Sequence, residues 1–328
     1  MEIKKAGIVG VGKYLPNNVL TNADLEKMVD TTNEWIVTRT GIKQRRIASD
    51  NEATSDMAVK AAKSALKNAG MTPQDIDLII VATITPDMFF PSTACLVQHK
   101  LGARNVPAFD ISVACSGFIY GLTIANQFVK GGLYKNALVI AAEKMSAITD
   151  WQDRSTCVLF GDGAGAAVLS EVEDGGILGA SLGADGSFGD LLQLPAGGSR
   201  MPASIQTVEN KLHTIKMEGN VLFKHAVKIM AEAALGVTER LGLSADDISL
   251  IIPHQANIRI LNAVAKKLGV DPAKKLYLNI EKYGNMSAAS SAVALTEAVE
   301  EGRIKRGDIV LLDAFGGGLT WGALAFKW

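Results

Sequence analysis

Cys115 is the residue of this sequence best placed to act as a nucleophile. It follows an apolar run at 108–113 that is typical of a strand, and it precedes a run at 116–125 that is typical of a helix. A thiol at a helix N-terminus lies in a positive partial potential, which lowers its pKa and raises the fraction of thiolate. The strand–cysteine–helix turn therefore suits a covalent nucleophile. The alternative is a small buried core residue, the usual place of a free cysteine.

His254 ends a second apolar run, at 248–252, and Asn257 and a helical pattern at 258–268 follow it. A histidine at a strand end can donate a ring N–H to a substrate carbonyl. The alternative is a loop histidine with a structural hydrogen bond. The other three histidines, at 99, 213 and 225, have no comparable setting and are expected to be structural or exposed.

Asn285 stands between Gly284 and Met286, ahead of small residues that permit a tight helix start. Its neutral amide can donate a hydrogen bond without adding charge, although a Gly-Asn pair taken alone is also common in turns.

Three consecutive glycines, Gly316, Gly317 and Gly318, follow a strand-like run at 309–313 and resemble a flexible loop. Their backbone N–H groups can approach a ligand closely, as an oxyanion hole requires. Two other glycine clusters, at 7–12 and 161–165, lack the Lys-Ser/Thr of a phosphate loop and the full dinucleotide spacing. No nucleotide site is therefore expected.

The bulk composition limits the classes of protein to consider. The chain has 328 residues, which suggests two domains or two halves, and 48% hydrophobic with 20% charged residues is a globular composition. A net charge of −1 gives no global field for nucleic acid, so any acidic partner must meet a local basic patch. No apolar stretch of about 18 residues is present, so no membrane span is expected.

The three cysteines form no disulfide framework, which favours a reducing compartment such as the cytoplasm. Cys95 and Cys157 lie in apolar runs and are expected to be packing residues. No Cys/His set has convincing zinc spacing, since Cys95 and His99 alone are a weak pair, and no metal site is expected.

The elements that must position these residues occur twice. The segment 70–80 closely resembles 242–252, each after a helical pattern (54–68 and 223–241) and each ending in a buried strand pattern. The runs 137–142 and 308–313 also correspond, as do the glycine-containing segments that begin at Phe160 and Phe315. This is the pattern of a duplicated α/β half rather than a solenoid.

The expected halves are 1–172, with Cys115, and 173–328, with His254 and Asn285, and a Gly-, Asp- and Ser-rich stretch at 171–200 is interpreted as their connection. A shift of 171 residues places Cys115 at Met286, beside Asn285, and returns His254 to Thr83. The candidate residues thus occupy related strand ends, where ligands gather in α/β sheets.

Six motifs together make the sequence resemble the ketoacyl synthase III family of the thiolase-like fold, over essentially its whole length. They are Trp-Ile-Val-Thr-Arg-Thr-Gly-Ile at 35–42, Ala-Cys-Ser-Gly-Phe at 114–118, Phe-Gly-Asp-Gly-Ala-Gly at 160–165, Pro-His-Gln-Ala-Asn at 253–257, Tyr-Gly-Asn at 283–285 and Phe-Gly-Gly-Gly at 315–318. The resemblance implies an α/β, five-layered αβαβα fold with two similar mixed sheets, a homodimer and a Cys115/His254/Asn285 triad.

The resemblance also implies a path for coenzyme A. Trp35 and Arg154 match the positions that sandwich the adenine ring. Further positions along the path and the tunnel wall are matched by Arg39, Gly219, Phe223, Asn257 and Arg259. An indole and a guanidinium both offer flat faces on which a base can stack.

Other implied features concern partners and specificity. Acyl carrier protein is acidic. The candidate ridge on this chain for docking it consists of Lys224, Arg259, Lys266 and Lys267. Phe90 matches a position that reaches across the dimer and closes the partner's acyl pocket, which favours acetyl-CoA or another short primer. Met286 stands where a threonine is usual, and Ser291-Ala292 where an aliphatic residue and proline are usual, so both affect the expectation for substrate choice.

The implied activity is the first condensation of dissociated fatty acid synthesis. Cys115 takes an acyl group from acyl-CoA, and malonyl-acyl carrier protein then condenses with it as CO2 departs, without a metal or redox cofactor. The alternatives are a starter synthase of polyketide or other specialised acyl metabolism and a non-catalytic carrier-binding paralogue. A thiolase requires a second active-site cysteine, and none follows residue 157.

Overall fold

The computed structural model describes residues 4–328, and its first half is built on a five-stranded mixed sheet. The strand order is β1 (Lys5–Tyr14), β7 (Asp162–Val172), β6 (Asn136–Lys144), β4 (Leu78–Ala82) and β5 (Ala108–Ile111). Strand β4 runs parallel to both β5 and β6, whereas β7 is antiparallel to β6 and β1. The central strands are buried on both faces, which explains their continuous apolar runs.

The second half repeats this order. Its sheet contains β8 (Gly176–Ala184), β13 (Thr320–Lys327), β12 (Ile309–Gly316) and β11 (Ile248–Pro253). A parallel bridge from Ile251 to Leu276 occupies the place that β5 has in the first sheet. The duplication expected from the sequence is therefore confirmed strand by strand.

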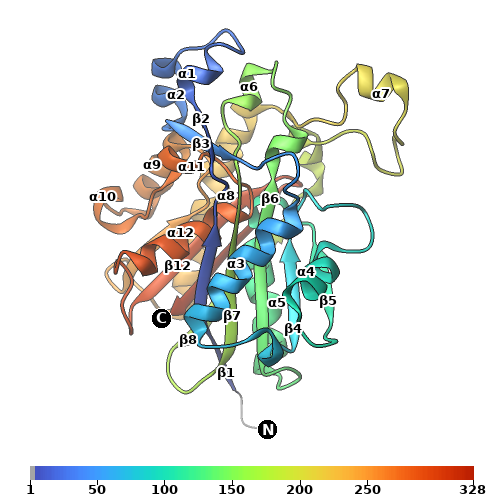
Figure 1. The fold of residues 1–328 in the computed structure, drawn as a ribbon. Coiled ribbons are helices and arrows are strands. Elements are labelled where there is room, and N and C mark those ends of the chain that lie inside the picture. Colours follow the sequence, from blue (N-terminus) through green and yellow to red (C-terminus); the bar gives the residue numbers. More distant parts are fainter. Residues whose placement is uncertain (1–3) are drawn as a thin grey trace.

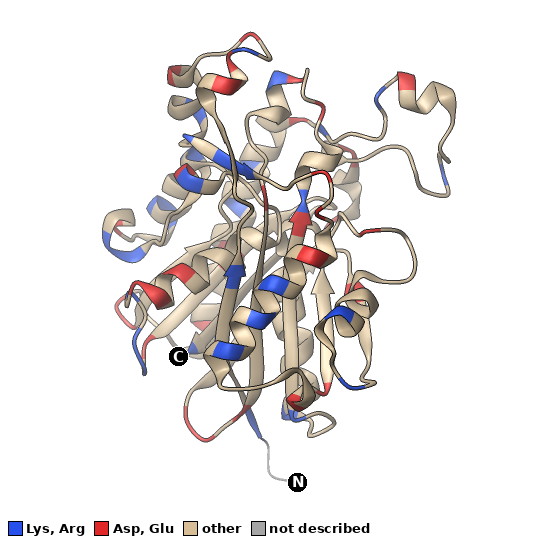
Figure 2. Cartoon of the chain, in the orientation of Figure 1, with Lys and Arg blue, Asp and Glu red and all other residues tan. Residues whose placement is uncertain are grey.

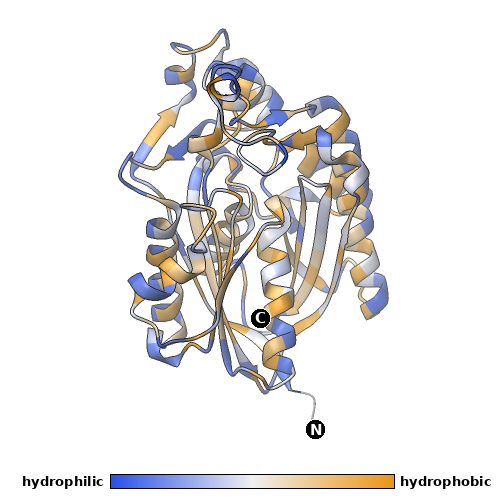
Figure 3. Ribbon diagram, turned by 90° about the vertical axis from the view of Figure 1, so that its right-hand side faces the viewer, coloured by the Kyte–Doolittle hydropathy of each residue, from blue (hydrophilic) through white to orange (hydrophobic). Residues whose placement is uncertain are grey.

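Helices cover both sheets and also fill the space between them (Figures 1 and 3). Helices α3 (Thr54–Ala69) and α4 (Thr93–Leu101) pack on the outer face of the first sheet, and α8 (Gly219–Leu241) and α9 (Ile258–Leu268) on that of the second. Helices α5 (Gly117–Lys130) and α12 (Ala289–Glu300) form the central layer with residues of both sheets. The expected five-layered αβαβα arrangement is confirmed.

Small residues let the central layer pack closely. A Cβ atom on Gly117, at the start of α5, would lie 3.3 Å from the Ala288 Cβ atom just ahead of α12. A Cβ atom on Gly165, in β7, would lie 2.5 Å from the Ala292 Cβ atom and 2.7 Å from its carbonyl carbon. Ala292, at the position where a proline was expected, is thus part of a tight contact between α12 and the first sheet.

The stretch 171–200 is not the simple connection that its composition indicated. The chain passes from the first sheet to the second between Val172 and Gly176, and β8 is a strand of the second sheet. Its glycines make room for neighbouring side chains, since a Cβ atom on Gly183 would lie 2.3 Å from the Trp321 ring. The glycine content therefore reflects packing within a sheet rather than a flexible linker.

Shorter elements gather at one end of the two sheets (Figure 1). They include the hairpin of β2 (Asn18–Thr21) and β3 (Gln44–Ile47), the pair β9 (Leu192–Gln193) and β10 (Lys216–Met217), and the helices α1 (Asn22–Leu25), α2 (Asn33–Thr40), α6 (Arg154–Cys157), α7 (Ile205–Glu209) and α11 (Ile280–Tyr283). The short helix α10 (Pro272–Lys275) instead lies beside the start of β11, where the Lys275 ammonium group donates to the Ile248 carbonyl oxygen. Helix α7 projects from the body on an extended arm.

Charged residues lie mainly on the outer helices and loops, as Figure 2 shows for the lysines of α3, while the strands carry few. Across residues 4–328, the apolar helices are too short or too polar to cross a membrane.

The packing of the central layer predicts opposite effects for two glycine-to-alanine changes. Gly165→Ala should lower the free energy of unfolding by about 1–3 kcal/mol or more, because the added methyl group meets backbone atoms of α12. Gly236→Ala is the matched control, since it lies inside α8 with open space around the new methyl group. It should be neutral or stabilising by up to about 1 kcal/mol. Thermal denaturation measures both changes, and equal melting temperatures would contradict the close-packing account.

Candidate active site

Cys115 lies in a one-turn 3-10 helix (Ala114–Ser116) between β5 and α5, as the sequence predicted. Ala114 has a φ of 45°, a left-handed conformation that a non-glycine residue adopts at a cost. The strained turn sets the thiol at the N-terminal end of α5, and the side chain is buried. This is the sharp strand-to-helix turn expected of a positioned nucleophile.

The glycines at 316–318 form a tight hairpin turn rather than the flexible loop expected from the sequence. Gly316 is the last residue of β12 and pairs with Thr320 at the start of β13. A Cβ atom on Gly316 would lie 2.7 Å from the Cys115 backbone nitrogen, so only glycine permits this approach. The Thr320 Oγ1 hydroxyl, 3.1 Å from the Val113 carbonyl oxygen, also ties the hairpin to the turn that carries Cys115.

His254 follows β11 directly, and its backbone N–H donates to the Asp313 carbonyl oxygen of β12 at 2.7 Å. The strand pairing thus ties His254 to β12, the strand that leads into the glycine hairpin that touches Cys115. The ring is buried, and within the described chain its Nδ1 atom has no hydrogen-bond partner. Burial lowers the pKa of His254 to about 3, so the imidazole is neutral near pH 7.

Asn285 is held at the edge of the first sheet by backbone hydrogen bonds. Its N–H donates to the Leu159 carbonyl oxygen at 2.9 Å, and its carbonyl oxygen accepts from the Gly161 N–H at 3.0 Å. The side-chain Oδ1 atom accepts from the Ser287 N–H at 2.8 Å, which leaves the amide NH2 group as a donor. The loop therefore fixes the amide in one orientation.

A buried hydrogen-bond network connects the loops of His254 and Asn285. Gln255 accepts from the Asn279 N–H at 3.0 Å, and the Asn279 amide donates to Glu297 at 2.9 Å. Glu297 also accepts from the Tyr283 hydroxyl at 2.6 Å. Since Gln255 follows His254 and Tyr283 lies two residues before Asn285, this network holds together the segments that carry the two candidate donors.

The structure does not show the lowering of the Cys115 pKa that the sequence predicted. Burial raises the pKa of the thiol to about 12, and the negative charge of Glu143 adds to the rise. The Ser287 hydroxyl and the local backbone act in the opposite direction but are weaker than desolvation. The sequence indicates the helix N-terminus, which lowers the pKa of a thiol. It does not indicate how far the thiol is removed from solvent, which raises that pKa.

Glu143 is a site residue that sequence reasoning missed. It is fully buried at the end of β6 and accepts hydrogen bonds from Thr83 and Thr85. Burial raises its pKa to about 7. The available signal was a carboxylate inside the otherwise apolar run of β6, where a charge requires an explanation.

Met286 turns away from the candidate donors. It is buried with Tyr283, Ala289 and Val293, and a Cβ atom on Gly163 of β7 would lie 2.7 Å from its sulfur atom. This unusual residue therefore packs against the first sheet.

Trp35 and Arg154, which are expected to sandwich adenine, lie together with Arg39, which is expected further along the coenzyme path. The guanidinium carbon atoms of Arg39 and Arg154 are 4.7 and 4.9 Å from the centre of the Trp35 ring. Arg154 also donates to the Asp30 carbonyl oxygen at 2.7 Å. Both guanidinium groups thus stack on the indole directly, and a base must displace one of them to be sandwiched.

The other residues expected along the coenzyme path lie where α8 and α9 begin. Gly219 is the first residue of α8, and the Arg259 guanidinium is 5.6 Å from the centre of the Phe223 ring. Asn257 caps α9 by accepting from the Arg259 N–H at 2.8 Å.

The four basic residues of the expected docking ridge are exposed. Lys224 lies in the first turns of α8, Arg259 at the start of α9, and Lys266 and Lys267 in its last turn. The contact between Arg259 and Phe223 brings the two helix starts together.

Phe90 lies on a loop between β4 and α4 with 84% of its surface exposed, and its neighbour Phe89 is 82% exposed. In the single chain, therefore, Phe90 closes no cavity.

The prediction for Cys95 as a packing residue is wrong, because it lies on the solvent side of α4, whereas Cys157 is buried as expected. His99 is exposed, and His213 and His225 are half-buried, His213 against Thr207 and His225 against Phe188. Among residues 4–328, no group of three or more His, Cys, Asp or Glu side chains could hold a metal ion.

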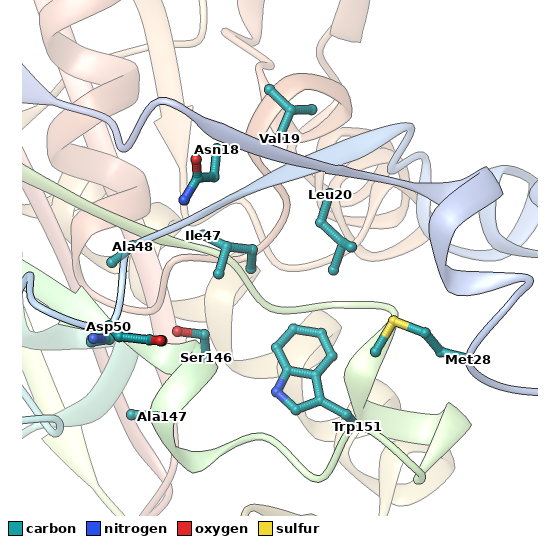
Figure 4. A pocket seen from close by; sticks show the side chains of 11 residues that line it. Asn18, Val19, Leu20, Met28, Ile47, Ala48, Asp50, Ser146, Ala147 and Trp151 are labelled. Carbon is teal, nitrogen blue, oxygen red and sulfur yellow. The ribbon is translucent and has the colours of Figure 1, made fainter.

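A hollow of about 540 Å³ lies away from these residues, between the β2–β3 hairpin and the segment after β6 (Figure 4). Met28, Ile47 and Trp151 are among the side chains that line it, together with Asp50 and Ser146. Its lining contains none of the three candidate triad residues.

Family descriptions match both halves of the sequence. 3-Oxoacyl-(acyl-carrier-protein) synthase III matches residues 109–186, which include Cys115, and its C-terminal counterpart matches residues 238–328, which include His254 and Asn285.

Similar proteins cover nearly the whole chain. Beta-ketoacyl-(acyl-carrier-protein) synthase III of Caldanaerobacter subterraneus subsp. tengcongensis is 62% identical over 324 residues, 98% of each chain. The crystal structure of 3-oxoacyl-(acyl-carrier-protein) synthase III from Aquifex aeolicus VF5 has a TM-score of 0.91 at 54% identity, covering 98% of this chain and 100% of that one. The priming beta-ketosynthase of the R1128 polyketide pathway has a TM-score of 0.93 at 37% identity, covering 99% and 97%.

The burial of His254 predicts that its imidazole stays neutral across the physiological range. Of the four histidine ring resonances in a ¹³C-edited NMR titration, the one lost in His254→Ala should not shift between pH 5 and 8. The ring resonance of the exposed His99, assigned from the spectrum of His99→Ala, provides the comparison. A His254 midpoint above pH 5.5 would show that the ring is solvated or faces a carboxylate.

Proposed function

Because the chain belongs to the beta-ketoacyl-(acyl-carrier-protein) synthase III family, the initiating condensing enzymes of fatty acid synthesis, we propose that Cys115 accepts a short acyl group from acyl-CoA and that this group then condenses with malonyl-acyl carrier protein. The products are 3-oxoacyl-acyl carrier protein, coenzyme A and CO2. One observation carries this proposal: the Gly316 backbone packs against the Cys115 backbone nitrogen, so the nucleophile of one half meets the glycine hairpin of the other.

In the first half-reaction the Cys115 thiolate attacks the thioester carbonyl and coenzyme A leaves. The developing oxyanion is stabilised by backbone N–H groups of Cys115 and of the hairpin Gly316, Gly317 and Gly318, whose first residue approaches the Cys115 backbone nitrogen. A rigid hairpin suits this role better than a flexible loop, because donors that are already oriented need no reorganisation during the reaction.

In the second half-reaction His254 and Asn285 donate hydrogen bonds to the malonyl thioester oxygen. Both groups are neutral donors, since burial keeps the imidazole uncharged and the Asn285 amide carries no charge. They stabilise the enolate that forms as CO2 departs. The carbanion attacks the acyl-Cys115 carbonyl, the new carbon–carbon bond forms as the carbon–sulfur bond to Cys115 breaks, and the released thiolate takes up a proton from solvent. Loss of CO2 drives the condensation, so the proposed reaction requires neither a metal nor a redox cofactor.

The coenzyme A moiety is proposed to enter past the residues above the sheets. Trp35 and Arg154 take the adenine ring after one guanidinium swings aside, and Arg39, Asn257 and Arg259 contact the rest of the molecule, with Gly219 and Phe223 along the wall. The stacked Trp35 cluster supports this assignment, because a flat base can replace a flat guanidinium on an indole.

A homodimer in the cytoplasm is the proposed working form. Phe89 and Phe90 support it, since two adjacent phenylalanines with more than four-fifths of their surface exposed are costly in water. In the dimer, Phe90 is proposed to close the acyl pocket of the partner subunit.

A starter role in polyketide synthesis is the second candidate, and the similarity to the R1128 priming ketosynthase supports it. The two pathways share the chemistry at Cys115 and differ in the carrier protein. Turnover with the carrier proteins of the two pathways, each loaded with malonyl, separates them.

The division of the two half-reactions can be tested by substitution. Cys115→Ser should abolish the acyl adduct that acetyl-CoA leaves on the protein, because an alcohol is far less ionised than a thiol. His254→Ala and Asn285→Ala should keep self-acylation but lose malonyl decarboxylation by about 10²–10³-fold, since each removes a donor to the enolate. Intact-protein mass spectrometry and CO2 release measure the two steps. An adduct on Cys115→Ser would place the nucleophile elsewhere, and loss of acylation alone in the other two would reverse their roles.

The docking ridge is tested by charge reversal. Arg259→Glu and Lys267→Glu should raise the apparent KM for malonyl-acyl carrier protein several-fold and weaken its dependence on salt, since both remove attraction to an acidic partner. Lys63→Glu is the matched control, an exposed lysine on α3 in the opposite outer layer. If both reversals behave like the control, the ridge is not the docking surface.

The primer preference is tested at Phe90. Wild type should prefer acetyl-CoA to octanoyl- and dodecanoyl-CoA, because a packed pocket resists inserted methylenes at a cost of about 1–3 kcal/mol. Phe90→Thr should extend the accepted chain length. Competition between the acyl-CoA primers, read by product mass, measures the profile. A wild-type preference for dodecanoyl-CoA would exclude a short pocket, and an unchanged profile in the variant would exclude Phe90 as its gate.

A further inference from the structure

Glu143 is a fully buried carboxylate for which the condensation mechanism gives no role. On β6, Ala137, Val139 and Ala141 point into the core between the two sheets. Side chains alternate along a strand, so Glu143 points into the same central layer. That layer contains the start of α5 and the Cys115 turn, and the charge of Glu143 acts directly on the thiol.

The hydrogen bonds of Glu143 are unevenly distributed between its two oxygen atoms. Oε2 accepts from the Thr85 hydroxyl at 2.6 Å, the Thr83 hydroxyl at 3.1 Å and the Ile84 N–H at 3.1 Å. Oε1 accepts only the long 3.3 Å branch of the Ile84 N–H. One oxygen atom is therefore anchored, and the other has capacity for a further donor.

Ser287 provides a donor in the right place. It is fully buried, and its φ of 48° is unusual for a residue other than glycine. Within residues 4–328 its hydroxyl completes no hydrogen bond of ordinary geometry, yet it lies near enough to lower the pKa of both the Cys115 thiol and the Glu143 carboxylate. A buried hydroxyl without a partner is unfavourable, so a strained backbone that holds one between two titratable groups indicates a function.

The charged side chains near Cys115, Ser287 and Glu143 leave room for only one anion among these three residues at a time. On the strands of the second half, burial keeps His254 neutral and raises the pKa of the Asp313 carboxyl well above its usual value. The ammonium group of Lys144, the next residue of β6, donates to carbonyl oxygens of the 49–52 segment, and Asp162 of the adjoining strand β7 accepts from Ser146. A thiolate beside an ionised Glu143 would place two anions in one buried site, which is strongly disfavoured.

We propose that Cys115, Ser287 and Glu143 share a single proton and a single negative charge, with the Ser287 hydroxyl as the bridge and Glu143 as the positioning residue that holds the proton while the thiolate reacts. This inference rests on the proposed role of Cys115 as nucleophile. It accounts for how a thiol buried away from any cation can ionise, since the charge moves within the pocket and no second charge is created.

The proton balance of acylation then closes within the site. The Cys115 thiol gives its proton to the Ser287 oxygen while the Ser287 hydroxyl gives its own to the Glu143 carboxylate, leaving a thiolate and a neutral acid. The thiolate forms the new carbon–sulfur bond as the bond to coenzyme A breaks. The coenzyme A thiolate takes up the proton that Glu143 releases, which restores the carboxylate for the next cycle.

Site-specific alkylation tests the shared proton without any acyl-CoA, so a failure of the proposed function would not hide the result. Iodoacetamide modification of Cys115 is followed by peptide mass spectrometry from pH 5.5 to 9.5. In wild type the rate should rise about tenfold per pH unit at low pH and then flatten near pH 7, where Glu143 ionises and opposes the thiolate. In Glu143→Gln the rate should keep rising about tenfold per pH unit through this range.

Two further variants distinguish a loss of the shared proton from a general disturbance of the fold. Thr85→Val removes the 2.6 Å hydrogen bond that stabilises the ionised carboxylate, so the flattening should move to higher pH. Ser287→Ala should also move the flattening to higher pH, since it removes a hydroxyl that lowers the pKa of Glu143. The exposed Cys95 is the internal control and should give the same profile in every protein. A wild-type profile without flattening, flattening that persists in Glu143→Gln, or a Thr85→Val profile that superimposes on wild type would overturn the proposal.

Discussion

The close approach of the two halves across the central helical layer is the constraint on which the rest of the structure depends. Helices α5 and α12 fit between the sheets only because Gly117 and Gly165 let them approach the opposing helix start and strand. Cys115 lies at the start of α5, and Asn285 lies just before α12. The packing that closes the core therefore also brings the turn that carries Cys115, the proposed nucleophile, close to the loop that carries Asn285, a proposed donor of the other half.

The close packing of the central layer also buries the site, and this burial determines the electrostatics of its side chains. Low solvent access keeps His254 neutral, raises the pKa of Glu143 to about 7 and opposes a free Cys115 thiolate. A neutral imidazole and an amide can stabilise an enolate without attracting a competing anion, because their dipoles are fixed in advance. Burial thus favours the condensation step and makes thiolate formation the step that needs assistance.

Much of this could be predicted from the sequence, because duplication leaves a repeat of apolar runs and glycine motifs that can be aligned. The strand ends that carry Cys115 and His254 and the loop of Asn285 were placed correctly for that reason. Three features could be recognised only in the folded structure. Residues 176–184 form a strand whose glycines accommodate Trp321, the glycines at 316–318 turn tightly, and Glu143 faces the thiol. Each depends on contacts between residues far apart in sequence, which local composition does not encode.

The central claim is that one site formed by both halves joins an acyl group to a malonyl unit through Cys115. The most direct measurement is the mass of acyl carrier protein after incubation of the enzyme with ¹³C-labelled acetyl-CoA and malonyl-acyl carrier protein. The account predicts a carrier that bears a labelled 3-oxobutyryl group in wild type and unchanged malonyl carrier in Cys115→Ala. Labelled product from Cys115→Ala, or malonyl carrier that wild type leaves intact, would contradict it.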